Sequence, residues 1–172
     1  MHIQKELKSG GGVDSATRSD IKQSLDRLNK LNDSTEGFDP AEVKRELQEC
    51  MQNYFGVFRR GEFMKKGLDQ LNEIKEKVDN LHLKDKSDAF NTSRVEAIEL
   101  QNLFEVAEAT AVSAYVRNES RGAHARDDFP ERDDENWLCH TIFDPKNKEV
   151  SKRDVNFQPS QVEAFPPKVR TY

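Results

Sequence analysis

The sequence has little of what marks several large protein classes. It holds 2 cysteines in 172 residues, Cys50 and Cys139, too few for a disulfide framework or a four-cysteine zinc site. Apolar residues make up 34% of the chain, below the usual share of about 45–50%. No apolar run approaches the roughly 18–20 residues that span a bilayer. We therefore expect a protein from a reducing compartment that is not integral to a membrane.

The chain also lacks a large excess of charge of one sign. The 27 Lys and Arg against 32 Asp and Glu give a net charge of −5, and the two signs are mixed along the chain. This mixture argues against nucleic acid as the main ligand, since a nucleic-acid-binding domain usually carries a basic patch or stripe. A composition this hydrophilic, with 34% charged residues, predicts a helix-rich chain with a small core.

Apolar periodicity is the main positive signal. Side chains recur at spacings of three and four in four segments, residues 20–32, 40–58, 62–81 and 93–118. Asp39 and Pro40 suit the cap and the first position of the second segment. Ser93 and Glu96 form a capping box that is predicted to open the last segment. The pattern predicts an antiparallel helical bundle over residues 19–118, with a core that contains Leu25, Leu28, Leu47, Met51, Leu71, Ile74, Leu103 and Ala107.

The longest predicted helix differs from the others because residues 100–114 are rich in Leu, Phe, Ala and Val, and small residues occur around the cylinder. A helix that is apolar on more than one side is usually buried on more than one side. One side can face the bundle, and we expect the other side to be covered by a partner.

The last third of the chain changes character. Between Arg117 and Glu135, 4 arginines face 7 acids. Two interpretations are open: ion pairs that tie the helix end to the loop, or direct contact with a ligand. Beyond this loop, residues 137–143 and 148–157 are predicted to be short strands joined by a turn at 144–147, and residues 164–168 to be extended.

Motifs for chemistry are weak. Cys139 and His140 are adjacent, a spacing that suits neither a zinc site nor a nucleophile pair, because neighbours on a strand point to opposite faces. His124 has no second metal-binding residue at the spacing that zinc sites usually show. The glycines at residues 10–12 follow a helix-like segment and lack the lysine of a phosphate-binding loop, and the dinucleotide fingerprint is absent. We interpret residues 1–8 as the end of a helix, and expect Met1 to be a start imposed on a longer natural chain.

The most distinctive run of the sequence is ESRGAHAR at residues 119–126, followed by DFP at 128–130, RDD at 132–134 and NWL at 136–138. It closely resembles the C-terminal region of the flavoprotein subunit of bacterial succinate dehydrogenase and its fumarate reductase relatives. The segments at residues 2–6, 47–52, 95–107 and 165–172 are similar to the same region, so the resemblance covers essentially the whole chain.

The resemblance implies an all-α fold, an antiparallel three-helix bundle like a spectrin repeat, followed by an extended C-terminal tail with short strands. It implies that residues 1–18 are the remnant of the preceding flavin-domain helix and linker, residues 19–118 the bundle, and residues 119–172 the charged loop and tail.

The resemblance also implies a parent enzyme that oxidises succinate to fumarate at FAD and passes electrons through iron–sulfur clusters to quinone. The family's FAD-attachment and substrate-binding segments have no counterpart here. No catalytic, cofactor-binding or metal-binding residue is therefore assigned to this chain, which we expect to be inactive alone. We expect Arg121, His124 and Arg126 to serve domain docking. Arg121 would pair with a carboxylate of the flavin domain, so Arg121→Ala would hardly change the stability of this chain.

The implied partners are the flavin-binding and capping domains of the same natural chain and the iron–sulfur subunit, with no nucleic acid. The membrane would be met only through the complex, in the cytoplasm at the inner face of the bacterial plasma membrane. Two other readings stay open: a free-standing helical adaptor or assembly protein, and a hydrolase that uses His124 or Cys139.

Overall fold

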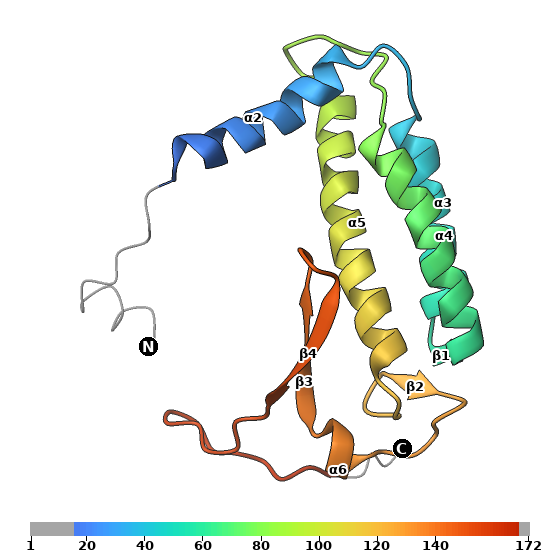
Figure 1. Cartoon of the computed structure of the whole chain (residues 1–172), viewed down its shortest axis with the longest axis vertical. Coiled ribbons are helices and arrows are strands. Elements are labelled where there is room, and N and C mark those ends of the chain that lie inside the picture. The colour runs from blue at the N-terminus through green and yellow to red at the C-terminus, as the bar shows by residue number, and fades with distance from the viewer. Residues whose placement is uncertain (1–15, 169–172) are drawn as a thin grey trace.

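The computed structural model describes residues 16–168, a row of helices with two small sheets at one end (Figure 1). The helices within this range are α2 (Arg18–Asp33), α3 (Pro40–Phe55), α4 (Gly61–Asp79), α5 (Thr92–Val116) and the short α6 (Asp134–Trp137). The strands are β1 (Phe58–Arg59), β2 (Ala125–Arg126), β3 (Cys139–Asp144) and β4 (Glu149–Asp154). The predicted helical character is confirmed. The predicted helix end at residues 1–8, the glycines at 10–12 and residues 169–172 lie outside the described part.

Polar side chains set the helix starts. The Asp39 carboxylate accepts a hydrogen bond from the backbone N–H of Ala41 at 2.9 Å, as the sequence predicts for a cap before Pro40. The cap of α5 is Asn91 and not the predicted Ser93: its side-chain oxygen accepts from the N–H of Arg94 at 2.8 Å. The Asn91 amide also donates to two carbonyls of the preceding loop, which holds it in the capping position.

Three helices share the core. In Figure 1, α3 and α5 run in one direction and α4 runs in the opposite direction. The two ends of this body are held by backbone pairing: Phe38 pairs with Leu81 at one end, and β1 pairs in parallel with β2 at the other. The buried apolar residues are Leu31, Val43, Leu47, Cys50, Phe55, Met64, Leu71, Ile74, Val78, Leu81, Leu83, Ala97, Leu100, Phe104, Ala107, Ala111 and Ala114. Leu47, Leu71, Ile74 and Ala107 confirm the predicted core, and Met51 packs against it partly buried.

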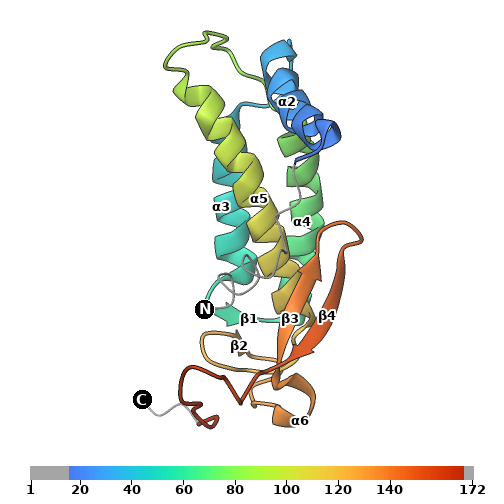
Figure 2. The ribbon, with the colours of Figure 1, turned by 90° about the vertical axis from the view of Figure 1, so that its left-hand side faces the viewer.

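Helix α2 stands away from the other three, and only its C-terminal end reaches the core (Figures 1 and 2). Leu31 is buried, whereas Leu25 is 51% exposed and Ile21 53% exposed. The prediction that Leu25 lies in the core is therefore wrong, and Leu28 is half-buried. The periodicity of this segment gives it an apolar face, but the helix leads away from the bundle and leaves most of that face in solvent.

Helix α5 buries one of its faces, with Leu100, Phe104 and Ala107 turned toward the bundle. Leu103 is 41% exposed, so its predicted core position is wrong. The reason is geometric, because one residue along a helix turns the side chain by about 100°. Phe104 takes the inward position and Leu103 the outward one.

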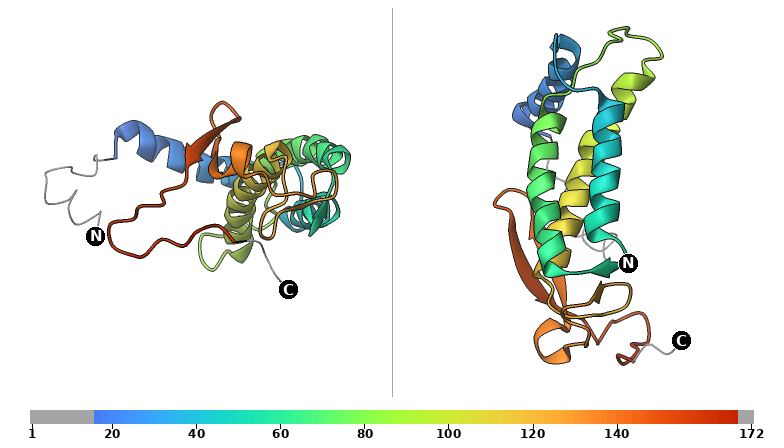
Figure 3. Two further views of the ribbon diagram at one scale, coloured as in Figure 1. Left: turned by 90° about the horizontal axis from the view of Figure 1, so that it is seen from below. Right: turned by 90° about the vertical axis from the view of Figure 1, so that its right-hand side faces the viewer.

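A hairpin covers part of the outer side of α5. Strands β3 and β4 pair in antiparallel register from Cys139 with Asp154 to Asp144 with Glu149, close to the predicted strands. The hairpin lies on the side of α5 opposite to α3 and α4 (Figures 1 and 3). Trp137, predicted to begin a strand, ends α6 instead and is buried. Two cations lie over its ring, Lys152 at 3.5 Å and Arg117 at 5.2 Å from the ring centre.

Candidate functional site

The end of α5 is closed by a buried arginine. The last carbonyls of a helix have no partner within the helix and carry partial negative charge. The Nη1 atom of Arg126, a residue only 3% exposed, donates to the carbonyl oxygens of Tyr115 at 3.1 Å and Arg117 at 2.9 Å. Its other edge binds both carboxylate oxygens of Asp128, at 2.7 and 2.8 Å. Arg126 thus joins the helix end to the loop that follows β2.

The end of α3 is closed in a similar way. Arg59 donates from Nε to the carbonyl oxygen of Gly56 at 3.0 Å and from Nη2 to that of Phe55 at 3.1 Å. Its Nη1 lies 2.8 Å from Nδ1 of His124, and Nε2 of His124 lies 3.1 Å from the carbonyl oxygen of Arg117. The half-buried ring of His124 therefore links β1 to the end of α5.

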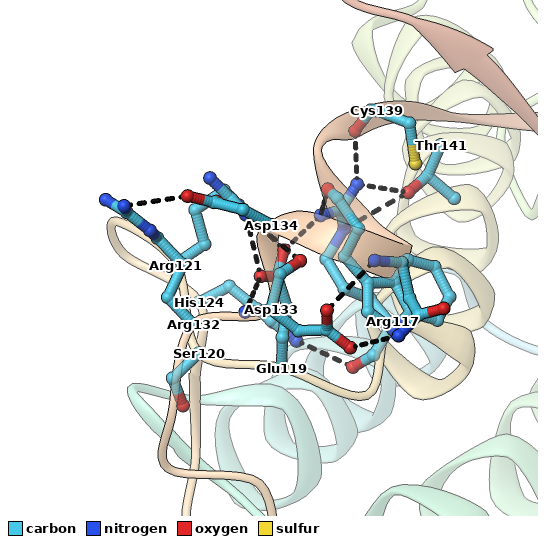
Figure 4. A network of polar contacts seen from close by, with 12 residues as sticks. Arg117, Glu119, Ser120, Arg121, His124, Arg132, Asp133, Asp134, Cys139 and Thr141 are labelled. Carbon is cyan, nitrogen blue, oxygen red and sulfur yellow. Dashed lines mark hydrogen bonds and ion pairs between the residues drawn. The ribbon is translucent and has the colours of Figure 1, made fainter. Parts of the chain in front are cut away.

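Glu119 lies at the centre of the loop and has no exposed surface. Its carboxylate accepts from Nε and Nη2 of Arg121 at 2.8 and 2.9 Å, from Arg117, and from the backbone N–H of Asp133 at 3.0 Å (Figure 4). Burial works to raise the pKa of Glu119, but the hydrogen bonds from Arg121, Asp133 and Arg117 outweigh it and lower this pKa. The carboxylate stays ionised and holds two arginines in place.

Arg121 lies at the edge of the same network, with 26% of its side chain exposed. Besides Glu119 it binds Asp134 at 2.7 Å, and Arg132 binds the other oxygen of Asp134 at 2.8 Å. The backbone of Arg121 and His124 exchanges two hydrogen bonds, at 2.8 and 3.0 Å, around a tight turn. Gly122 occupies this turn with a φ of +58°, a conformation that favours glycine.

The structure brings together the three residues that the sequence singled out. Arg121 and Arg126 form ion pairs within this chain, and His124 makes hydrogen bonds to Arg59 and to the carbonyl oxygen of Arg117. The carboxylates that pair with Arg121 within the described residues are Glu119 and Asp134. Sequence reasoning missed Arg59, because it stands 65 residues before His124 and only the fold brings them together. It also missed the burial of Glu119. The available signal was that this acid lies between two arginines in the sequence.

The cysteine and histidine candidates are not assembled into a site. Cys139 is half-buried and His140 exposed, in alternation along β3. Burial raises the pKa of the Cys50 thiol to about 11, which makes it a poor nucleophile. Among residues 16–168 no three His, Cys, Asp or Glu side chains are grouped to hold a metal ion.

Next to the network, an apolar groove runs between α5 and the hairpin. It has a volume of about 710 Å³, and its walls include Val106, Ala109 and Ser113 of α5 and Ile142 of β3. Arg59, Arg117 and His124 also line it. Val106 is 64% exposed, and with the exposed Leu103 it extends the apolar surface along α5. Within the described range, no helix combines the length and the apolar character that a bilayer crossing needs.

The arginine network lies in a part of the chain with clear relatives. Residues 44–172 match the family model described as fumarate reductase flavoprotein C-term. The chain belongs to that family. It is 41% identical over 170 residues to the succinate dehydrogenase flavoprotein subunit of Coxiella burnetii, a match that covers 99% of this chain and 29% of that subunit. The family resemblance drawn from residues 119–138 is thereby confirmed.

Solved structures agree with the family assignment. The FrdA chain in a structure of E. coli quinol fumarate reductase superposes with a TM-score of 0.76 at 32% identity, over 92% of this chain and 28% of that one. Adenylylsulfate reductase from Archaeoglobus fulgidus shares the fold alone, with a TM-score of 0.72 at 18% identity, over 94% of this chain and 28% of that one. The chain thus spans less than a third of the length of these relatives.

Proposed function

We propose that this chain is the C-terminal helical part of the flavoprotein subunit of a succinate dehydrogenase. The observation that carries the proposal is the 41% identity to a succinate dehydrogenase flavoprotein subunit over 170 residues. The whole subunit would oxidise succinate to fumarate at FAD and pass electrons through iron–sulfur clusters to quinone. The chemistry would be performed by flavin-binding and capping domains, and the present chain alone would be inactive and hold no cofactor.

The proposal includes the arrangement of the helices and the division of the chain into segments. Helices α3, α4 and α5 would form an antiparallel three-helix bundle like a spectrin repeat. Residues 1–18 would connect it to a flavin-binding domain, and residues 119–172 would be the loop and tail that complete the interface. The shared core of the three helices and their alternating direction support this division.

The docking surface in this proposal is the outer side of α5 together with the hairpin. Leu103 and Val106 are exposed there beside the groove, and the apolar face of α2 carries Ile21 and Leu25, also exposed. Helix α2, helix α5 and the hairpin all face the viewer in Figure 2, so they lie on the same side of the molecule. Its occupant would be the flavin-binding domain of the same natural chain, with the iron–sulfur subunit nearby, in the cytoplasm at the inner face of the bacterial plasma membrane.

Arg121, His124 and Arg126 would serve docking by giving the loop its shape. Arg126 is occupied by the helix end and Asp128, so its contribution is to fix the loop backbone. Arg121 keeps a quarter of its side chain at the surface, where a partner can contact the remaining edge of the guanidinium.

A domain exchange tests the proposal. The matching region of the Coxiella subunit is replaced by this chain, and the hybrid is coexpressed with the Coxiella iron–sulfur subunit. We expect bound flavin and succinate-dependent reduction of an artificial electron acceptor. The Coxiella subunit without this region, and this chain mixed with FAD and succinate, should give neither. A hybrid that folds but lacks flavin and activity would contradict the proposal.

A pair of substitutions tests the docking surface. Val106→Asp in the hybrid places a charge in the apolar surface of α5 and should reduce the bound flavin. Phe90→Asp makes the same kind of change at a fully exposed residue of the loop before α5, and should leave the flavin content unchanged. Equal effects of the two variants would count against this surface. If the chain alone captures the iron–sulfur subunit while the hybrid is inactive, the adaptor reading is favoured.

A further inference from the structure

His124 is the contact point of three segments that are distant in sequence. Arg59 reaches it from β1, which follows α3, and the carbonyl oxygen of Arg117 reaches it from the end of α5. The ring itself belongs to the tight turn that leads into β2. Beside this contact, β1 and β2 are joined by the backbone bond from the N–H of Asp127 to the carbonyl oxygen of Arg59, at 2.9 Å.

The hydrogen bonds determine where the proton of the imidazole lies. A guanidinium only donates, so Nδ1 of His124 must accept from Arg59 and cannot carry a hydrogen. The single proton of the neutral ring is then on Nε2, where it is donated to the carbonyl oxygen of Arg117. A second proton on Nδ1 would point at an N–H of Arg59 and abolish that bond.

The charges around the ring are positive. Arg59 of β1, Arg117 at the end of α5 and Arg126 of β2 all repel a charged ring, while the nearby hairpin contributes the uncharged Thr141. Three carboxylates of the loop bind arginines and not the ring. Glu119 binds Arg117 and Arg121, Asp127 binds Arg60, and Asp128 binds Arg126. Burial, together with the three arginines, lowers the pKa of His124.

We propose that His124 is an acid-sensitive latch, which holds β1 against the end of α5 while the ring is neutral and releases it when Nδ1 is protonated. Release leaves Arg59 bound only to the carbonyls of α3 and adds a positive charge at the groove beside α5. The latch makes the interface between β1, β2 and α5 dependent on pH in the mildly acidic range. This property goes beyond the proposed function and does not depend on it.

The direction of the effect follows from linkage. The folded protein binds the second proton more weakly than the unfolded chain, whose histidines titrate near 6.5. The contact is therefore complete above that pH, and is lost as the pH falls from about 6.5 toward the lower folded value. Glu119 and Asp128 have lowered pKa values and stay ionised over this range.

The test uses the full chain labelled with 15N. Nitrogen NMR at pH 7.5 should show Nδ1 of His124 without a proton and Nε2 protonated. Amide hydrogen exchange of Asp127, corrected for the pH dependence of the exchange chemistry, reports the opening between β1 and β2. Between pH 7.5 and 5.5 the opening constant should rise severalfold, up to about tenfold, because this range ends one unit below the unfolded pKa of 6.5.

Two variants make the comparison specific. His124→Gln keeps a neutral acceptor and donor, and should remove the acid-induced opening at Asp127. His140→Gln changes an exposed ring on β3, and this variant should show the same acid-induced opening at Asp127 as the natural sequence. A proton on Nδ1 at pH 7.5, or equal acid-induced opening in His124→Gln and the natural sequence, would overturn the latch. The tautomer is measured on the natural sequence, so it decides the question even if His124→Gln does not fold.

Discussion

At the scale of single residues, arginine is used here to end helices. Arg59 and Arg126 each place guanidinium N–H groups on the last carbonyls of a helix, where glycine caps or lysine side chains are more usual. The planar fork allows one side chain to bind the helix end on one edge and another group on the other. Arg126 uses this to connect α5 to Asp128, and Arg59 to connect α3 to His124.

Replacing Arg126 by leucine should destabilise the chain strongly. The change leaves the Asp128 carboxylate and the carbonyls of α5 without their partner. Losing one member of a buried pair costs about 3–5 kcal/mol, and the 36% exposure of the Asp128 side chain favours the lower end of that range. Arg45→Leu removes an exposed pair with Glu49 and should cost no more than about 1 kcal/mol. Urea denaturation at pH 7 measures both; similar midpoints for the two variants would refute the capping role.

Arg121→Ala should also destabilise this chain, in contrast to the expectation from sequence. That expectation assumed a carboxylate partner in another domain, whereas Arg121 binds the fully buried Glu119 with two hydrogen bonds. Hydrogen bonds to a charged group contribute about 1.5–3 kcal/mol, and the partial exposure of Arg121 favours the lower end. Arg121→Lys should recover little, because lysine lacks the planar fork. An unchanged unfolding midpoint for Arg121→Ala would instead support a carboxylate partner in another domain.

At the scale of elements, the contact between α3 and α4 depends on a glycine. A Cβ atom at Gly67 would lie 2.5 Å from Cβ of Tyr54 and 2.6 Å from the ring of Phe55. The two helices therefore approach each other closely at this residue. The Sγ atom of Cys50, at 3.5 Å from the carbonyl oxygen of Gly67, lies at the same contact.

Gly67→Ala is expected to destabilise the protein although alanine is the better helix former. The propensity gain is about 1 kcal/mol, but overpacking typically costs about 1–3 kcal/mol, and here the close atoms include a Cβ that cannot turn away. Lys65→Ala, at an exposed residue of the same helix, should change stability by less than about 0.5 kcal/mol. Thermal unfolding of both variants provides the measurement, and a raised midpoint for Gly67→Ala would show that α3 and α4 can separate freely.

At the scale of the whole molecule, carboxylates stabilise both ends of the helical body. Asp39 caps α3 at one end, and Glu119, Asp128 and Asp134 bind arginines at the other. The pKa of each of these groups is lowered, for Asp39 and Asp128 chiefly by hydrogen bonds that favour the charged form.

The protein should therefore unfold in acid. A group with a lowered folded pKa contributes its full stabilisation above its unfolded pKa, here 3.8 for Asp and 4.5 for Glu. The contribution is lost as the pH falls below these values toward the folded ones. The urea midpoint, measured at pH 7, 5 and 3, should decrease mainly between pH 5 and pH 3. The Asp128→Asn variant should show a smaller decrease. A midpoint that is as high at pH 3 as at pH 7 would contradict this account.

The local features of this protein were determined by its sequence. Apolar spacing placed the helices and Asp39 placed a helix start, because both depend on residues a few positions apart. The run at residues 119–138 identified the family for the same reason. Tertiary structure decided the rest. Only packing shows that α2 leaves Leu25 in solvent, that Phe104 rather than Leu103 faces the core, and that Arg59 meets His124 across 65 residues. Such contacts depend on how helices are placed relative to one another, which short-range periodicity does not encode.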